Sequence, residues 1–339
     1  MIDLDDKETL RSLDPQNTLE TTDSLVKQCQ VAWSESNKVV PTHSFSDIRN
    51  IVFCGMGASI YGALVLKALE ASSLSFPTEV VSDYHLPPYV NHQTLVVLTS
   101  YSGTTEEVLS CAQEAKNKKA KMLVLTSGGE LAEFAKSSNI TAYIFDGKLN
   151  LSKTPRLGAG YTILGLIGLF NASKVLSAEE AVIENALDRA LLQMDDIKKA
   201  AYNDYEKYID AIPIIFAAEH LSGNAQILRN QFNETSKTFS SHFIIPDLNH
   251  HLMEGLQFPK DSNLKFLSFF SRNYSPKLQK RVLLTNEVVK QNNRDLIVYE
   301  TSGASFYDDF LEVLIYGGYL TLFLALNYKQ NPSVNPWVD

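Results

Sequence analysis

Apolar and polar positions along this chain form two alternating patterns. Short apolar runs rich in Val, Ile and Leu are typical of parallel strands that are buried on both faces. Longer segments carry apolar residues three and four positions apart, which predicts helices. The predicted strands begin at residues 51, 78, 95, 120 and 140, and again at 212, 243, 264 and 296. Strands that alternate with helices predict an α/β fold built on doubly wound parallel sheets.

The alternation stops once, which divides the chain into two α/β halves. An apolar helix at 158–170 is followed by a longer, more polar helical segment at 178–208, and the strands then resume. Before the first strand, apolar residues at helical spacing predict a helical segment. We therefore predict an N-terminal helical arm at 1–45, a first domain at 46–172, a helical connector at 173–208 and a second domain at 209–339.

The segment Ser100–Thr105 is the strongest candidate for binding chemistry. It follows an apolar strand, precedes a helix and carries hydroxyl side chains at five of its six positions. The backbone N–H groups of a helix's first turn have no partner within the helix, so they attract anions. The alternative is ordinary N-capping, for which one hydroxyl is enough. No Lys follows Gly103, which argues against a nucleoside triphosphate. We predict that Ser100, Ser102 and Thr105 bind a phosphate group.

A glycine-rich turn, Gly55–Ser59, follows the first strand and opens a helix. A dinucleotide fingerprint would have a third glycine where this chain has Ile60, so a dinucleotide site is a minor alternative. Ligands of open parallel sheets bind beyond the carboxyl ends of the strands, where this turn and Ser100–Thr105 would both lie. We predict that Gly57 and Ser59 lie beside the sugar of a phosphorylated ligand.

Charge and cysteine content narrow the range of partners. The chain has 339 residues and a formal net charge of -9, which argues against a nucleic-acid partner. Its three cysteines are scattered, which fits a reducing compartment and gives neither a disulfide framework nor metal-ligand spacing. The N-terminus lacks the basic and apolar regions of a signal peptide. The longest apolar stretch, near 161–170, is too short to span a membrane. We expect a cytoplasmic protein without a membrane partner.

Several motifs together resemble the sugar isomerase (SIS) domain, namely Gly55–Ser59, Ser100–Glu106 and Leu125–Gly128. Three more motifs resemble the bifunctional phosphoglucose/phosphomannose isomerases of the phosphoglucose isomerase superfamily, and they are Thr154–Tyr161, Asn230–Lys237 and Asp247–His251. The resemblance covers nearly the whole chain after the first helix of the arm. It implies two tandem SIS-type domains with doubly wound parallel sheets, and an isomerase that needs no cofactor.

The resemblance also implies roles for three residues. Glu234 would be the base that moves a proton between C1 and C2 of the sugar through a cis-enediol, a task that suits a positioned carboxylate. His250 would open the sugar ring, since histidine titrates near neutrality. Arg156 would stabilise negative charge on the enediolate. The alternatives are an exposed helical Glu, a capping or surface His, and an Arg in a surface ion pair.

Two departures from the family pattern affect the candidate site. His251 stands where the family has Asn, so the choice between His250 and His251 stays open. The family also has a lysine near the C-terminus after a Pro-rich turn. Asn331–Asp339 resembles that turn without such a lysine, although Lys329 precedes it. In related isomerases the histidine reaches into the neighbouring subunit's site, which implies a homodimer.

The predicted function is interconversion of glucose 6-phosphate, and of mannose 6-phosphate, with fructose 6-phosphate. No metal is expected, because the nearest histidines, at 242, 250 and 251, lack ligand spacing. One alternative is a phosphosugar-sensing module without catalysis. Another is an amino-sugar phosphate isomerase of the same fold.

Overall fold

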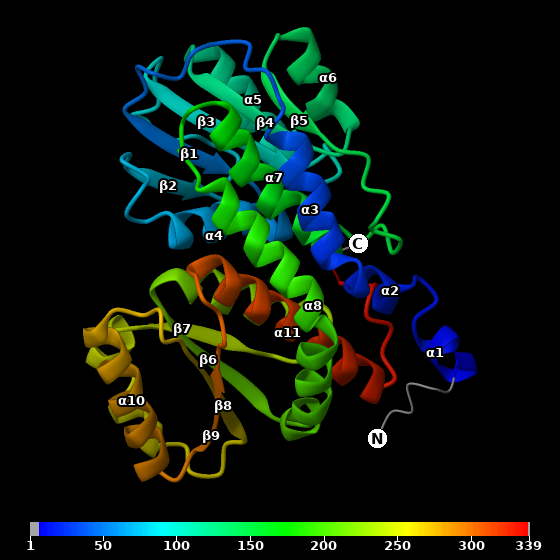
Figure 1. Ribbon diagram of the computed structural model, residues 1–339, viewed down its shortest axis with the longest axis vertical. Coiled ribbons are helices and arrows are strands. Elements are labelled where there is room, and N and C mark those ends of the chain that lie inside the picture. The colour runs from blue at the N-terminus through cyan, green and yellow to red at the C-terminus, as the bar shows by residue number, and fades with distance from the viewer. Residues whose placement is uncertain (1–6, 338–339) are drawn as a thin grey trace. The chain divides into compact units, whose positions relative to one another are not determined.

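The computed structural model describes residues 7–337 of the chain. They form two compact units, one of Ser24–Glu180 and one that combines the N-terminal residues as far as Asp23 with those from Ala181 onward. Each unit holds one parallel sheet (Figure 1). The strands and helices lie where the sequence predicts them. The N-terminal region is helical as predicted, with α1 (Lys7–Leu13), α2 (Thr18–Asp23) and α3 (Leu25–Ser36). The domain boundaries stay a prediction.

The sheet of the unit Ser24–Glu180 has five parallel strands in the order β2-β1-β3-β4-β5. Every residue of the central strand β3 is buried, because both of its faces are covered. Burial on both faces explains why its sequence is a continuous apolar run and does not alternate. The strands are β1 (Asn50–Cys54), β2 (Thr78–Val81), β3 (Thr94–Ser100), β4 (Lys121–Thr126) and β5 (Thr141–Ile144).

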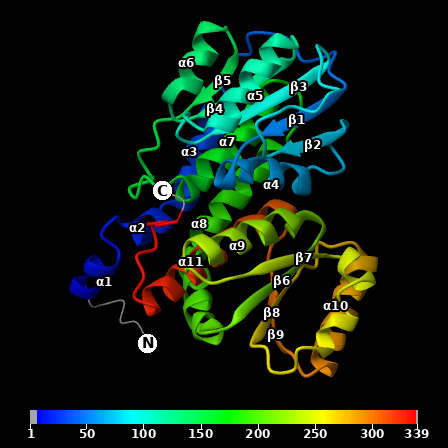
Figure 2. The ribbon, with the colours of Figure 1, turned by 180° about the vertical axis from the view of Figure 1, so that it is seen from behind.

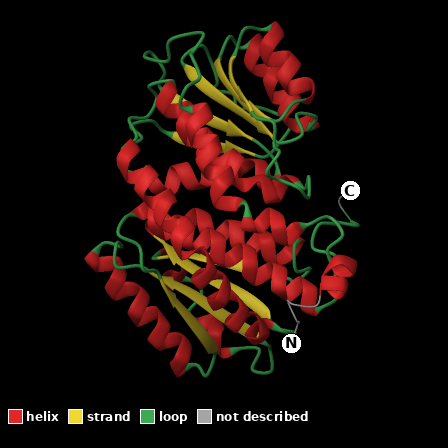
Figure 3. Ribbon diagram, turned by 45° about the vertical axis from the view of Figure 1, so that its right-hand side comes forward, coloured by secondary structure: helices red, strands yellow, loops and turns green. Residues whose placement is uncertain are grey.

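Helices cover both faces of this sheet (Figure 3). Glycines let α7 approach α3 closely. A Cβ added at Gly160 would lie 2.6 Å from the Cβ of Gln28, and one at Gly168 would lie 2.1 Å from Ser36 Oγ. The remaining helices of this unit are η1 (Gly57–Ile60), α4 (Tyr61–Leu69), α5 (Glu106–Asn117), α6 (Gly129–Ser137), η2 (Pro155–Gly158) and α7 (Ala159–Ala172), where η marks a 3-10 helix.

The sheet of the second unit has four parallel strands in the order β7-β6-β8-β9, which repeats the order β2-β1-β3-β4 of the other sheet. Helix α9 packs on β6 and β7, and α10 packs on β8 and β9 (Figure 2). The strands are β6 (Ile212–Ala218), β7 (Ser241–Ile245), β8 (Leu264–Phe270) and β9 (Asp295–Glu300). The helices after α7 are α8 (Glu180–Asp204), η3 (Tyr205–Tyr208), η4 (Glu219–Leu221), α9 (Ser222–Glu234), η5 (Asp247–His250), η6 (Glu254–Gln257), α10 (Pro276–Gln291) and α11 (Phe306–Asn327).

Helix α11 corrects the expectation that the longest apolar stretch lies near 161–170. It has 22 residues and a mean hydropathy of 1.5 over its most apolar window, so by length and composition it could cross a membrane. However, 94% of that window is buried within the protein. A buried core helix passes the same test of length and composition. Its close packing against α9 agrees with this, because a Cβ at Gly317 would lie 2.9 Å from a methyl carbon of Leu228.

Candidate functional site

The loop after β3 is folded around the buried hydroxyl of Ser100. Ser100 Oγ lies 2.7 Å from Thr105 Oγ1 and accepts a hydrogen bond from the Gly103 N–H at 3.0 Å. Ser102 is exposed, and its Oγ lies 3.0 Å from Thr104 Oγ1. The hydroxyls nearest to solvent therefore belong to Ser102, Thr104 and the half-buried Thr105. Ser100 holds the backbone that carries them.

Gly103 lets this loop press against the loop that follows β4. Its φ is +75°, in the left-handed region that favours glycine. A Cβ added at Gly103 would lie 1.8 Å from the carbonyl oxygen of Gly128, so no larger residue fits unless the backbone moves. The Gly103 carbonyl also accepts a hydrogen bond from the Leu131 N–H at 2.9 Å. The two loops are thus packed backbone to backbone.

The first turn of α5 lacks a side-chain cap. Thr105 is the N-cap residue, and its side chain makes no capping hydrogen bond because its hydroxyl contacts Ser100 instead. The N–H groups of this first turn and the positive end of the helix dipole can therefore bind an anion. In the strand order β2-β1-β3-β4-β5, the direction of winding reverses between β1 and β3. Open α/β sheets bind ligands at this kind of reversal.

The glycine-rich turn after β1 lies against the same loop. Ser59 is buried in η1, and its Oγ accepts a hydrogen bond from the Tyr101 N–H at 3.1 Å. Gly57 is exposed with a φ of +52°, and a Cβ there would meet nothing within 4 Å. The backbone of Gly57 is therefore open to an approaching ligand. Ser59, like Ser100, fixes the position of a neighbouring segment.

Arg156 lies on the short helix η2, which is also held next to this loop. Helix η2 contacts η1, and Gly158 lies under the ring of Tyr101, where an added Cβ would be 2.1 Å from a ring carbon. The Tyr101 hydroxyl accepts a hydrogen bond from Asn150 Nδ2 at 2.9 Å. Arg156 itself is buried. Within this unit, the structure thus gathers the three segments that carry the predicted residues Gly57, Ser59, Ser100, Ser102, Thr105 and Arg156.

In the second unit, Glu234 is the last residue of α9 and is half-buried. It lies at a cavity of about 250 Å³ that is lined by Asn233, Glu234, Lys237, Asn335, Pro336 and Trp337. Asn335 Nδ2 lies 3.5 Å from Glu234 Oε2, and Lys237 Nζ donates to the Glu234 backbone carbonyl at 2.6 Å. The Glu234 carboxylate is therefore within reach of a molecule bound in this cavity.

The histidine pair lies on and just after η5. His250 is exposed at the end of that helix, whereas His251 Nε2 lies 3.3 Å from Asp247 Oδ2. Lys329 follows α11, is exposed and does not line the Glu234 cavity. The lysine that lines it is Lys237, which lies in the motif Asn230–Lys237. Sequence reasoning did not single out Lys237, Asn335 or Trp337.

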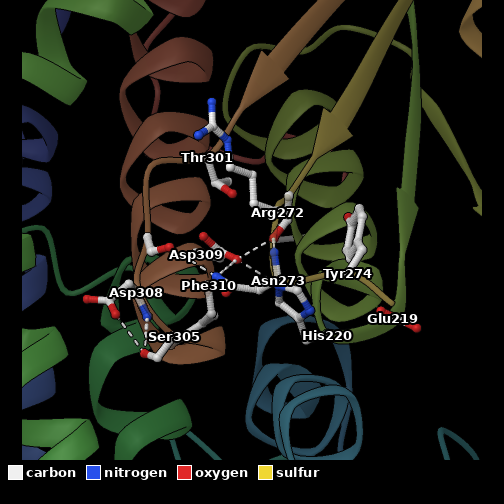
Figure 4. A network of polar contacts seen from close by, with 12 residues as sticks. Glu219, His220, Arg272, Asn273, Tyr274, Thr301, Ser305, Asp308, Asp309 and Phe310 are labelled. Carbon is white, nitrogen blue, oxygen red and sulfur yellow. Dashed lines mark hydrogen bonds and ion pairs between the residues drawn. The ribbon is translucent and has the colours of Figure 1, made fainter. Parts of the chain in front are cut away.

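The carboxyl edge of the second sheet carries a buried polar network (Figure 4). Asp309 Oδ2, from α11, lies 2.9 Å from His220 Nε2 and accepts hydrogen bonds from Ser271 Oγ at 2.6 Å and Asn273 Nδ2 at 2.9 Å. Burial raises the pKa of Asp309, but hydrogen bonds from His220, Ser271, Asn273 and Thr301 outweigh it, so the pKa is lowered overall. The network therefore favours the ionised carboxylate.

The comparisons with known proteins agree with this architecture. The SIS domain family model matches residues 44–145, and the model of the bacterial phospho-glucose isomerase C-terminal SIS domain matches residues 197–339. Bifunctional phosphoglucose/phosphomannose isomerases from Aquifex aeolicus and Caldicellulosiruptor bescii are 29% and 27% identical to the chain. These alignments cover 84% and 93% of this chain, and 86% and 95% of the relatives. The chain is thus a tandem SIS-domain protein that is similar along most of its length to the bifunctional phosphoglucose/phosphomannose isomerases.

The fold of this SIS-domain chain is also found among solved structures. The structure of glucosamine-6-phosphate deaminase from Thermotoga maritima aligns with a TM-score of 0.69 and 15% identity, and the alignment covers 98% of each chain. At that identity the likeness concerns the fold alone. Within residues 7–337, no three His, Cys, Asp or Glu side chains are placed to hold a metal ion together.

Proposed function

We propose that this protein is an aldose–ketose isomerase that interconverts glucose 6-phosphate, and mannose 6-phosphate, with fructose 6-phosphate. The names of its relatives, which align along 86% and 95% of their own lengths, carry this proposal. The site supports it, because isomerisation needs a phosphate-binding loop and a positioned carboxylate. The loop after β3, which leads into a helix without a side-chain cap, would bind the phosphate, and the Glu234 carboxylate, which lines a cavity, would be the base.

The phosphate would bind at the N-terminus of α5. Ser102 and Thr105 would donate hydroxyl hydrogen bonds there, and Ser100, which contacts Thr105 Oγ1 and the Gly103 N–H, would act by holding the loop. Gly57 and Ser59 would lie beside the sugar, where the open backbone of Gly57 leaves room. The phosphate would supply binding energy and fix the sugar chain for reaction.

The proton transfer would be carried by Glu234. Its carboxylate would remove the proton from C2 of the aldose, which leaves an enediolate with its charge on O1. A proton would then move from O2 to O1, and the protonated Glu234 would return its proton to C1 to give the ketose. Arg156 would stabilise the negative charge that develops on these oxygens. His250 would open the ring first, by moving a proton between the ring oxygen and the C1 hydroxyl. Because C2 becomes planar in the enediol, one base could serve both epimers in a site with room beside C2 for either face of the enediol to turn toward it.

We also propose that the enzyme is a homodimer in which His250 lies near the neighbouring subunit's site, and that it acts in the cytoplasm without a cofactor. The exposure of His250 supports the first point, since its imidazole is accessible to another chain. The three cysteines are free and buried, which fits a reducing compartment.

The test is a coupled assay with fructose 6-phosphate that measures glucose 6-phosphate and mannose 6-phosphate separately. Glu234→Gln keeps the size of the side chain and removes the base, so turnover should fall at least about a thousandfold, within the range that general-base catalysis and positioning supply. Glu184→Gln, an exposed position on α8, is the matched control and should be unchanged. Turnover that survives Glu234→Gln would remove Glu234 from this role. Absence of wild-type turnover, with fructose 6-phosphate still raising the melting temperature, would favour a sensor.

A further inference from the structure

The segment 331–337, here called the C-terminal strap, is anchored to the N-terminal residues of its own unit. Asn331 Nδ2 donates to Gln16 Oε1 at 2.8 Å, and Ser333 Oγ lies 2.7 Å from Thr18 Oγ1. Ser333 is buried, and its N–H donates to Asn331 Oδ1 at 2.9 Å. In Figure 1 the strap, in red, runs beside α2. Its course is therefore fixed by specific hydrogen bonds, so the residues that follow have a defined place.

Beyond these anchors, the strap forms one wall of the Glu234 cavity. Asn335, Pro336 and Trp337 line that wall, and Asn335 contacts the Glu234 carboxylate. Trp337 is 96% exposed. A large aromatic ring beside a cavity that also holds a carboxylate and a lysine has the composition of a small-molecule site, in which apolar surface is combined with a few polar groups.

We propose that Trp337 is a sugar-stacking residue, whose indole face packs against the C–H groups of the hexose phosphate while Glu234 exchanges its proton. The face of an indole ring is electron-rich and attracts the weakly positive hydrogens of a C–H surface. A sugar presents such a surface on one side and hydroxyls on the other. The polar side would meet Glu234, Asn335 and Lys237. This proposal rests on the isomerase function proposed above.

Intrinsic fluorescence tests the contact directly, because the chain has only two tryptophans and the other, Trp33, is buried in the first unit. The protein carries Trp33→Phe to leave Trp337 as the single reporter, and Glu234→Gln to prevent turnover. Fructose 6-phosphate is then titrated, and inorganic phosphate serves as the control ligand. We expect a saturable change in Trp337 emission with the sugar and no change with inorganic phosphate. No response to the sugar would overturn the proposal, as would an equal response to both ligands.

Kinetics test whether the contact contributes to binding. Trp337→Ala should raise KM about tenfold and change kcat less than about threefold, since a stacking contact acts on bound sugar as well as on the transition state. Trp337→Phe should restore most of the loss, because it keeps an aromatic face. Phe258→Ala removes another exposed aromatic side chain of the same unit and should leave both constants unchanged. An unchanged KM in Trp337→Ala would overturn the proposal.

The two proposals fail in different ways. If the wild type isomerises fructose 6-phosphate but Trp337 neither responds to it nor affects KM, the stacking contact is wrong and the isomerase stands. If Trp337 responds to the sugar but no isomerisation occurs, the contact stands and the isomerase is wrong. An emission spectrum that changes with protein concentration but not with added sugar would assign Trp337 to a contact between two copies of the chain, and would overturn the stacking proposal.

Discussion

Replacement of Gly103 by Ala should strongly destabilise the candidate phosphate loop. Two costs add at this position. The left-handed φ of +75° costs an L-residue roughly 1–2 kcal/mol. The new Cβ would also lie 1.8 Å from the Gly128 carbonyl oxygen and 2.9 Å from Thr126 Oγ1, so the two loops would have to separate. Overpacking of this kind costs roughly 1–3 kcal/mol.

Separation of the loops would also weaken the hydrogen bond from the Leu131 N–H to the Gly103 carbonyl. A hydrogen bond of this kind contributes roughly 1 kcal/mol. The summed loss in the free energy of unfolding is therefore about 4 kcal/mol. Gly57→Ala is the matched control for stability, because Gly57 has a similar φ of +52° and a Cβ there meets nothing within 4 Å. Gly57→Ala should lower the free energy of unfolding only by the cost of the left-handed φ, about 1 kcal/mol.

Urea unfolding, followed by circular dichroism, measures both free energies. The assay for ligand binding is the rise in melting temperature of the folded protein with fructose 6-phosphate, which Gly103→Ala should largely abolish because the α5 amides lose their alignment. If Gly103→Ala and Gly57→Ala destabilise the protein equally, the close approach of the two loops contributes nothing and the reasoning is refuted. The same conclusion would follow if Gly103→Ala kept full sugar binding.

Two further predictions concern charges in the second unit. Because the pKa of Asp309 is lowered in the folded protein, its contribution to stability is present above the ordinary carboxylate pKa and is lost as pH falls through the lowered value. Asp309→Asn should therefore lower the free energy of unfolding by about 3 kcal/mol near neutral pH, and by progressively less below about pH 4. Urea unfolding of both proteins at several pH values measures this difference. A difference that stays constant with pH would contradict the prediction. Arg189 donates two hydrogen bonds to the buried Asp308, so Arg189→Met should lower the free energy of unfolding by about 1–2 kcal/mol. Lys136→Met removes an exposed ion pair with Glu133 and should lower it by less than about 0.5 kcal/mol. Equal melting temperatures for these two variants would show that the ion pair with Asp308 contributes no more to stability than an exposed ion pair does.

The strands and helices could be predicted from the sequence because each is determined by a pattern of apolar residues within its own segment. The apolar run that begins at residue 95 and the apolar helical segment at 158–170 indicate directly which faces are covered, and the structure confirms the strand and the helix that they predict. The serine-rich loop could be located for the same reason, since strand, loop and helix follow one another in the chain. The order of the strands adds what local pattern cannot, namely that this loop lies where the winding of the sheet reverses.

The parts that sequence reasoning missed depend on contacts between distant residues. Nothing in the local sequence of 331–337 indicates that Asn335 reaches Glu234, which lies about a hundred positions earlier, or that Thr18 anchors Ser333. The longest apolar stretch was misplaced near 161–170 rather than at α11 for a related reason. Its charged residues lie in the first turns and interrupt the apolar pattern there, and only the packed structure shows that Asp308 and Asp309 are buried with partners.

The two sheets share one strand order but differ at the edge where a ligand would bind. In the first sheet, the loop after β3 leaves Ser102 exposed and the first turn of α5 without a side-chain cap. In the second sheet, the loop after β8 turns Ser271 inward, and the Asp309 carboxylate already accepts the hydrogen bonds that an anion would receive. A second negative charge placed beside that carboxylate would be repelled in a buried site. This contrast favours the first sheet over the second as the place where a phosphate would bind.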